Sequence, residues 1–259
     1  AQYLGVPYQL DPLGEGPAGR IDRDPLLRHD RFDCLTYVET VMAEALAPNT
    51  AAVPEALRRI RYRDGRIDFA ARNHFPDADW IPNNLAQGWL RELNAEVAGP
   101  HALAEARSRI TRRAWLANLA HNPAQAGNAL LQNDAAAQRE LARLAAAAVD
   151  GESRTRYVPK EALADPAVLA RIPSGALVFA VRPHTSLYGR IGSVLNIAHV
   201  GFAIRRDGRL LYRYAASGRA HAVIERDFAR YFAQAAASRS YAGVAIYEIH
   251  SPDGPDFER

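Results

Sequence analysis

Cys34 is the only cysteine in the 259-residue chain, and it stands where the sequence changes from a loop into a helix. A single thiol excludes an intrachain disulfide and any metal site built from several cysteines. Free cysteines are most often inert core residues. However, Asp33 before it has the side chain of a helix N-cap, and the unpaired N–H groups at a helix start favour an anion. Because a thiolate is the nucleophilic form and its pKa falls at helix N-termini, Cys34 is also a candidate nucleophile with a lowered pKa.

A nucleophilic cysteine needs a base, usually a histidine that a third polar group orients. The chain has eight histidines, and most lie in polar or loop-like segments where solvent exposure is the simpler interpretation. His199 differs because it opens the apolar segment 198–204, which has the pattern of a strand. An imidazole there needs a polar partner. His199 is therefore either a satisfied core histidine or the base that Cys34 requires.

A helix over residues 34–47 must position Cys34. Its apolar residues recur at steps of three and four from Cys34 onward, so the thiol faces whatever packs on this helix. Pro48 and Asn49 end the helix. A second helix is expected over residues 54–62.

The remaining chain divides into loops, a helical part and a β-rich part. Residues 1–31 and 64–84 carry the Gly, Pro, Asp and Asn that favour loops. Residues at about 85–150 have helical spacing and few β-branched side chains, which predicts helices. From residue 172, short apolar runs with turn signals between them predict antiparallel strands.

Asp207-Gly208 is the clearest of these turn signals, and it predicts a hairpin. Helices followed by a small antiparallel sheet are typical of the α+β class. We expect a single catalytic domain over 1–259, with a mostly helical insert at about 85–150. The β-rich half at about 172–250 carries the candidate base.

Composition limits the class of protein further. Apolar residues make up 48% and charged residues 24% of the chain, as in an ordinary globular protein. The net charge of +3 is too small to predict nucleic-acid binding. No run of 18 apolar residues occurs, which excludes a transmembrane helix. The sequence opens without a charged and apolar leader, so the protein is either cytoplasmic or numbered after removal of a targeting segment.

Several short segments occur in an order and spacing that suggest one enzyme family. The main three are Leu4-Gly-Val-Pro-Tyr8, Phe32-Asp-Cys34-Leu-Thr-Tyr-Val-Glu39 and Ala198-His199-Val-Gly201. Together they resemble the NlpC-type family of cell-wall cysteine hydrolases. The Asp-Cys-Leu-Thr-Tyr-Val-Glu version resembles its N-acetylmuramoyl-L-alanine amidase-like branch, as do the segments 62–84 and 172–175. The resemblance implies a papain-like core, in which the cysteine begins a helix packed on a small antiparallel sheet or barrel.

The resemblance also implies roles for individual residues. Cys34 is the nucleophile, His199 is the base and later the acid, and Tyr8 hydrogen-bonds the oxyanion alongside the Cys34 backbone N–H. The family often has a histidine as third member, but here Tyr214 stands in that place. A phenol oxygen can accept a hydrogen bond from the imidazole but carries no charge. Either Tyr214 or another group, such as Asn196, then orients the base.

On the substrate side, the resemblance implies a muropeptide cleaved between N-acetylmuramic acid and L-alanine. Polar and aromatic residues of the loop 72–84 are the candidates to hold it, and each could equally cap or pack that loop. These candidates are Arg72, His74, Asp79, Trp80 and Asn84. No cofactor, nucleic acid or protein partner is expected, and no metal, because His and Glu do not occur at ligand spacing. Such a substrate favours a periplasmic or secreted protein, with a cytoplasmic one as the alternative.

Two other functions stay open from the sequence. One is an endopeptidase of the same superfamily that cuts within the stem peptide. The other is a cell-wall binding module with a weak or inactive site, which the departure at Tyr214 favours and the presence of Cys34 and His199 disfavours.

Overall fold

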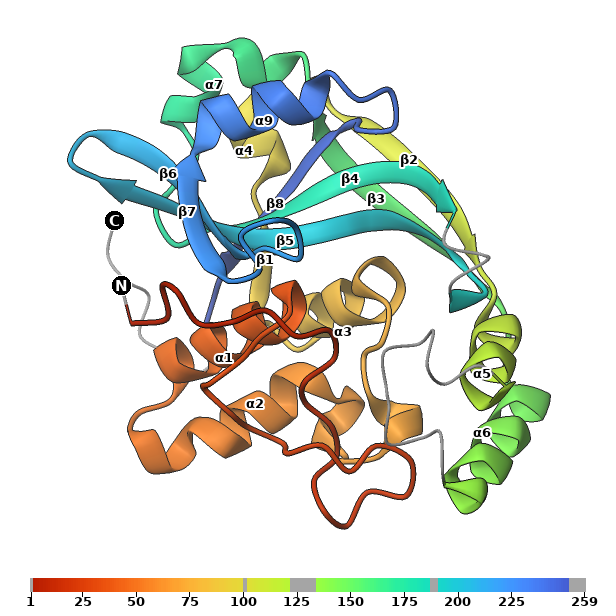
Figure 1. Cartoon of the computed structure of the whole chain (residues 1–259). Helices are drawn as coiled ribbons and strands as arrows, with labels where there is room; N and C mark the ends of the chain where they lie inside the picture. Colours follow the sequence, from red (N-terminus) through yellow and green to blue (C-terminus); the bar gives the residue numbers. More distant parts are fainter. Residues whose placement is uncertain (1, 100–101, 122–133, 187–190, 252–259) are drawn as a thin grey trace.

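The computed structural model describes residues 2–99, 102–121, 134–186 and 191–251. These residues form an α+β structure, with helices on both faces of an antiparallel sheet (Figure 1). The helices are α1 (Cys34–Leu46), α2 (Val53–Arg61), α3 (Ile81–Ala86), α4 (Asn94–Ala98), α5 (Arg112–His121), α6 (Ala135–Ala147), α7 (Pro166–Ala170) and α9 (Phe228–Ala236). The strands are β1 (Leu90–Glu92), β2 (Ala104–Ile110), β3 (Gly151–Pro159), β4 (Leu177–Ser186), β5 (Val194–Arg206), β6 (Arg209–Ala215), β7 (Val223–Asp227) and β8 (Gly243–Ile249).

The strands pair in the order β2-β3-β8-β4-β5-β6-β7, and β1 adds to β8. The register between β4 and β5 shifts in the middle, because His199 faces Ala180 whereas Ile197 faces Val181. Ala198 is thus an extra residue in β5. Bulges of this kind bend a strand and re-aim its side chains. The bulge lies directly before the candidate base.

The elements that the local pattern predicts best are confirmed. The first two helices begin within a residue of their predicted starts. The hairpin between β5 and β6 turns at Asp207 and Gly208, whose φ angles are +50° and +73°, as a two-residue turn of this type requires. The β-rich half is present as β4 to β8.

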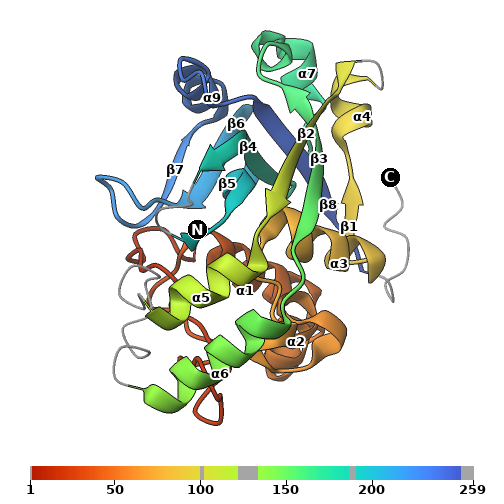
Figure 2. The same ribbon diagram turned by 90° about the vertical axis from the view of Figure 1, so that its right-hand side faces the viewer.

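The prediction of a helical insert at about 85–150 is wrong in part. Helices α5 and α6 lie there side by side, at one end of a long hairpin (Figure 2). However, β1 and β2 also lie there, and β2 pairs along its whole length with β3. In β2 the buried residues Ala106, Ser108 and Ile110 alternate with exposed charges. Two of these buried residues, Ala106 and Ser108, have small side chains, so the β propensity of the sequence does not reveal the strand. The segment therefore extends the sheet.

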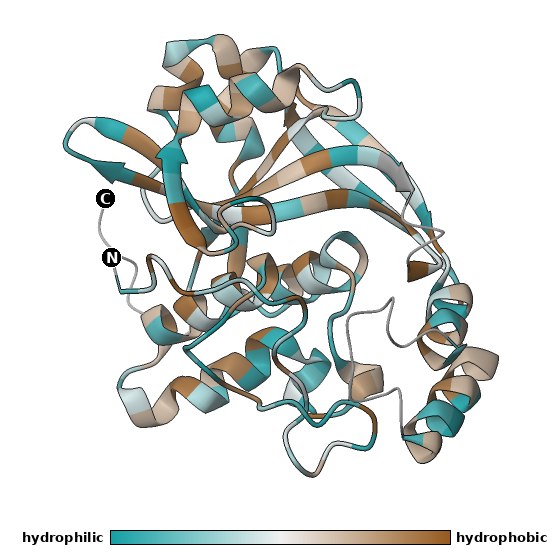
Figure 3. Ribbon diagram, in the orientation of Figure 1, coloured by the Kyte–Doolittle hydropathy of each residue, from teal (hydrophilic) through white to brown (hydrophobic). Residues whose placement is uncertain are grey.

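Two hydrophobic cores lie on opposite faces of the sheet. One joins the sheet to α1 and α2, and the other joins it to α4, α7 and α9. Figure 3 shows the brown, apolar residues of the central strands between these two layers. Among the described helices, none is long and apolar enough to cross a membrane.

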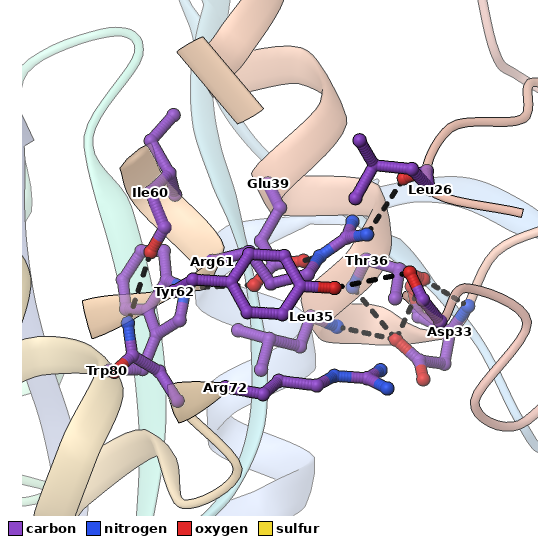
Figure 4. A network of polar contacts seen from close by, with 12 residues as sticks. Leu26, Asp33, Leu35, Thr36, Glu39, Ile60, Arg61, Tyr62, Arg72 and Trp80 are labelled. Atoms are coloured by element: carbon purple, nitrogen blue, oxygen red, sulfur yellow. Dashed lines mark hydrogen bonds and ion pairs between the residues drawn. The ribbon is translucent and has the colours of Figure 1, made fainter. Parts of the chain in front are cut away.

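A buried ion pair connects the helical layer internally. The carboxylate of Glu39 on α1 lies 2.7 Å from the guanidinium of Arg61 on α2, and the two side chains are only 3% and 1% exposed. The Trp80 indole donates to the second Glu39 oxygen at 3.0 Å, and Arg61 donates to the carbonyl of Leu26 at 2.8 Å (Figure 4). Two helices and two loops therefore meet at one charge pair.

Glu39→Gln should lower the free energy of unfolding by about 3–5 kcal/mol, because it leaves the Arg61 charge buried without its partner. Urea unfolding at pH 7 measures this. The matched control is Glu55→Gln, which removes an exposed carboxylate that pairs with Arg58 and Arg59 on α2. The control should cost about 0–1 kcal/mol. Equal losses in the two variants would contradict the stabilising role of the buried pair.

Candidate active site

Asp33 caps α1 so that Cys34 is the first residue of the helix. Its Oδ1 accepts hydrogen bonds from the N–H groups of Leu35 at 3.0 Å and Thr36 at 2.8 Å. The Thr36 hydroxyl accepts in return from the Asp33 N–H at 2.9 Å, which completes a capping box. Oδ2 accepts from the N–H of Asp11 at 2.9 Å. The predicted cap is confirmed, and it fixes the position of the thiol.

The Cys34 thiol contacts β5 at a place where β5 is not paired with its neighbour β6. Strands β5 and β6 pair only from Phe202 onward. Ahead of this point, the N–H of Val200 hydrogen-bonds the Cys34 sulfur. Gly201 lies in the same stretch, where an added Cβ would come within 2.5 Å of a β6 carbonyl oxygen. Helix α1 and β5 thus bring Cys34 beside the residue that follows His199.

The surroundings of Cys34 raise the pKa of its thiol to about 12. Loss of solvent is the largest cause, and the Asp33 carboxylate is the next. Hydrogen bonds from the N–H groups of Val200, Cys34 and Leu35 act in the opposite direction but are weaker. The lowered pKa that we expected at a helix start is therefore wrong for the free protein. The cap that begins the helix also places a carboxylate beside the sulfur.

His199 is half-buried, and its Nε2 lies inside the protein without a hydrogen-bond partner among the described residues. Burial, followed by the positive charge of Arg182, lowers the pKa of the imidazole to about 4. The imidazole is therefore neutral at pH 7. A neutral imidazole with an unpaired nitrogen is the form that can accept a proton from a thiol.

Tyr214 contacts His199 through its ring. The two rings meet edge to face, with centroids 4.8 Å apart and planes at 87°. The Tyr214 hydroxyl hydrogen-bonds Arg226 and Tyr231. The phenol thus limits the orientation of the imidazole by packing, and its oxygen is engaged elsewhere.

Asn196 does not orient the base. It is fully buried, its Oδ1 accepts from the Ser108 hydroxyl, and its N–H donates to Asp77 at 2.9 Å. These contacts join β5 to β2 and to the turn before α3. The alternative that Asn196 serves His199 is therefore contradicted.

Tyr8 lies beside the start of α1. It forms a parallel bridge with Phe32, two residues before Cys34, and its N–H donates to the carbonyl of His221 at 2.9 Å. The Tyr8 and His221 rings are 5.4 Å apart. The predicted oxyanion residue thus lies between α1 and the loop 216–222.

Trp80 and Asn84 lie in the core rather than at a surface open to substrate. Both are 0% exposed. The Asn84 amide donates to the carbonyls of Ile60 at 3.1 Å and Trp80 at 2.8 Å, and the Trp80 indole is bound to Glu39. Trp80 and Asn84 were expected either to bind substrate or to pack and cap the loop, and their buried positions match packing and capping.

His74 and Asp79 line a cavity of about 510 Å³. His74 Nε2 lies 2.7 Å from the Phe69 carbonyl oxygen, and its ring centroid is 4.6 Å from that of Trp115. Burial is the main cause that lowers the pKa of His74 to about 3. Asp79 forms an ion pair with Arg112. These two predicted residues therefore border a space that a ligand can enter.

Arg72 borders the same cavity but is bound to carboxylates of the N-terminal loop. Its guanidinium lies 2.7 Å from Asp11, 2.9 Å from Asp22 and 3.8 Å from Glu15, and its side chain is 9% exposed. Burial raises the pKa of Glu15 to about 7 and that of Asp22 to about 6. Because Asp11 also binds Asp33, this acidic cluster is connected to the cap of α1. The Arg72 guanidinium is therefore paired with carboxylates inside the protein.

A second cavity, of about 330 Å³, lies beside the candidate base. His199 and Tyr214 line it together with Arg182, Arg226 and Tyr241. Sequence reasoning missed the last three. Arg182 directly follows a predicted strand, but only the pairing of β4 with β5 brings it to the histidine. Within the described ranges, no three His, Cys, Asp or Glu side chains are grouped so as to hold a metal ion.

Asp33→Asn should lower the pKa of Cys34, because it removes the negative charge beside the sulfur while keeping an N-cap oxygen. The rate of alkylation by iodoacetamide as a function of pH measures the pKa. Asp30→Asn is the control, since Asp30 is an exposed carboxylate paired with Arg28. An unchanged midpoint in Asp33→Asn would show that the carboxylate does not act on the thiol.

Glu15→Gln should become more stable relative to the wild type as pH rises from 4.5 to 7.5. Folded Glu15 keeps its proton to about pH 7, whereas its ordinary pKa is 4.5. The wild type therefore loses stability as pH rises through this window, and Gln cannot titrate. The relative gain should be about 2–3 kcal/mol by urea unfolding. Glu140→Gln removes a half-buried carboxylate that pairs with Arg143 on α6, and it should show no such gain. A pH-independent difference for Glu15→Gln would contradict the prediction.

Comparison with known proteins agrees with this arrangement. Residues 1–238 match the family model described as AmiA-like, N-acetylmuramoyl-L-alanine amidase-like. A solved protein of Legionella pneumophila is 30% identical with a TM-score of 0.86, over 95% of this chain and 85% of that one. An N-acetylmuramoyl-L-alanine amidase of Bacteroides uniformis is 25% identical with a TM-score of 0.66, over 96% of each chain. No curated protein matches the chain. The chain thus belongs to the N-acetylmuramoyl-L-alanine amidase-like family.

Proposed function

We propose that this protein is a cysteine hydrolase that cleaves the amide between N-acetylmuramic acid and L-alanine in peptidoglycan or muropeptides. One observation carries the proposal. The Cys34 sulfur meets the N–H of Val200, and the neighbouring His199 keeps a buried ring nitrogen unpaired. The thiol thus meets β5 at the residue next to a neutral imidazole, which supports a Cys/His site of the papain-like kind, and the family supports the substrate class.

The proposed chemistry starts from the neutral pair. His199 removes the thiol proton as the sulfur attacks the amide carbon, so that no free thiolate has to exist at a pKa of about 12. The Cys34 N–H and the Tyr8 hydroxyl donate to the oxyanion. The imidazolium then gives its proton to the leaving amine of L-alanine. Water attacks the remaining thioester, with His199 again as the base, which releases the muramic acid carboxylate and restores the thiol.

On the substrate side, the cavity bordered by His74 and Asp79 is the place proposed for the part of the muropeptide beyond the scissile bond. Its wall combines the aromatic rings of Phe69, Phe75 and Trp115 with several charged and polar side chains, which suits a ligand with both apolar and polar parts. Arg72 acts there indirectly, because its three carboxylate partners hold the N-terminal loop against the cap of Cys34.

Incubation with a defined muropeptide, followed by mass spectrometry, tests the proposal. We expect the intact stem peptide and the free sugar acid as products. Cys34→Ala should reduce the rate by at least about 10³-fold, since the nucleophile is lost, with its unfolding transition unchanged. A cut within the stem peptide would replace the amidase by the endopeptidase alternative. Wild-type activity in Cys34→Ala would overturn covalent catalysis.

A further inference from the structure

The cavity of about 330 Å³ beside His199 has an unusual distribution of charge. Arg182, Arg219 and Arg226 line it, and the residues around it include no Asp or Glu among those that the structure describes. The proposed base His199 lines the cavity, which lies on the α9 side of the sheet. A pocket with several guanidinium groups and no carboxylate is suited to an anion.

Strand alternation explains why no carboxylate reaches this cavity. In β7, Ile224 and Arg226 face the cavity, whereas Glu225 between them points to the other face. There Glu225 is bound by Arg213 at 2.5 Å and Arg206 at 2.7 Å. Glu225, which adjoins Arg226 in the sequence, is therefore held away from the cavity arginines.

Two of the cavity arginines are held in place by neighbours. Arg182 donates to Ser240 at 2.7 Å and to Ser238 at 3.3 Å, and its guanidinium lies 5.8 Å from the centre of the Tyr241 ring. Arg226 is hydrogen-bonded to the Tyr214 hydroxyl. Positioned guanidinium groups lose less entropy when they bind a carboxylate.

An unpartnered hydroxyl points to a ligand independently of the charges. Tyr241 is 1% exposed and lines the cavity, and its hydroxyl has no hydrogen-bond partner among the described residues. A buried hydroxyl without a partner costs stability, so such groups usually serve a function. This hydroxyl is a donor beside Arg182, as a bound carboxylate would require.

We propose that this cavity is a subsite for a carboxylate on the peptide part of the substrate, which Arg182 and the Tyr241 hydroxyl bind and Arg219 and Arg226 attract. The subsite deepens the proposed function and rests on it for the identity of the substrate. A cavity of this volume holds only part of a muropeptide. The ligand class is therefore an acidic side group of the stem peptide close to the scissile amide.

Binding to the inactive Cys34→Ala protein tests the subsite without catalysis. The probes are N-acetylmuramoyl-L-alanyl-D-glutamate and its diamide, in which both carboxylates are replaced by neutral amides. Calorimetry should show that the diacid binds about tenfold more tightly or better, because charged hydrogen bonds are lost in the diamide. Equal affinities for the two probes would overturn the proposal.

Single substitutions in the Cys34→Ala background identify the groups responsible. Arg182→Gln and Tyr241→Phe should each weaken diacid binding about tenfold and change diamide binding about twofold or less. Tyr241→Phe removes only an unpartnered oxygen, so the melting temperature should not fall. The control Arg230→Gln removes an exposed charge on α9 outside the cavity and should change neither affinity. Unchanged diacid binding in both cavity variants would overturn the proposal.

The two proposals fail in distinguishable ways. Cleavage of diacid and diamide with the same KM would overturn the carboxylate subsite and leave the amidase proposal standing. Tighter binding of the diacid that depends on Arg182, with no cleavage by the wild-type protein, would support the subsite and overturn the amidase.

Discussion

The buried ion pair between Glu39 and Arg61 constrains the orientation of α1, the helix that Cys34 begins. Two charges removed from water must stay together, because the loss of either partner leaves an uncompensated charge. Glu39 follows Cys34 by five residues, which places the two side chains about 140° apart around the helix axis. With Glu39 held against α2, Cys34 is turned away from that helix and toward β5. The thiol's direction is thus set in a part of the core that no substrate reaches.

Charges of opposite sign lie on the two sides of Cys34 and His199. Asp33 and the acidic cluster on Arg72 lie on the side of the N-terminal loop, and the cavity arginines lie on the side of α9. Burial is the largest cause of both pKa shifts, and in addition the Asp33 carboxylate raises the pKa of the thiol and Arg182 lowers that of the imidazole. Both effects favour the neutral pair over thiolate and imidazolium. The free protein therefore keeps the Cys34 thiol protonated, and in the proposed mechanism proton transfer has to accompany attack on the substrate.

Local patterns predicted what depends on a few neighbouring residues, namely the Asp33 cap, the first two helices and the turn at Asp207-Gly208. They did not distinguish buried from exposed polar residues in the loop 72–84, because that difference depends on distant partners. Trp80 becomes a core residue through Glu39, and Arg72 through carboxylates about 50 to 60 residues away. The same limit explains the missed strand β2 and the sign of the thiol's pKa shift. The strand depends on its pairing with β3, and the pKa shift depends on the groups that the fold packs around the sulfur.

The split between β5 and β6 shows how the fold opens a regular sheet at the proposed active site. In a continuous sheet the N–H of Val200 would pair with a neighbouring strand, but here it meets the Cys34 sulfur. The bulge at Ala198 re-aims the next residue, His199, toward the cavity that Arg182 borders. If a substrate carboxylate occupies that cavity, it offsets the charge of Arg182, and only burial then holds down the pKa of His199. The base would thus be strengthened by the bound substrate on which it acts.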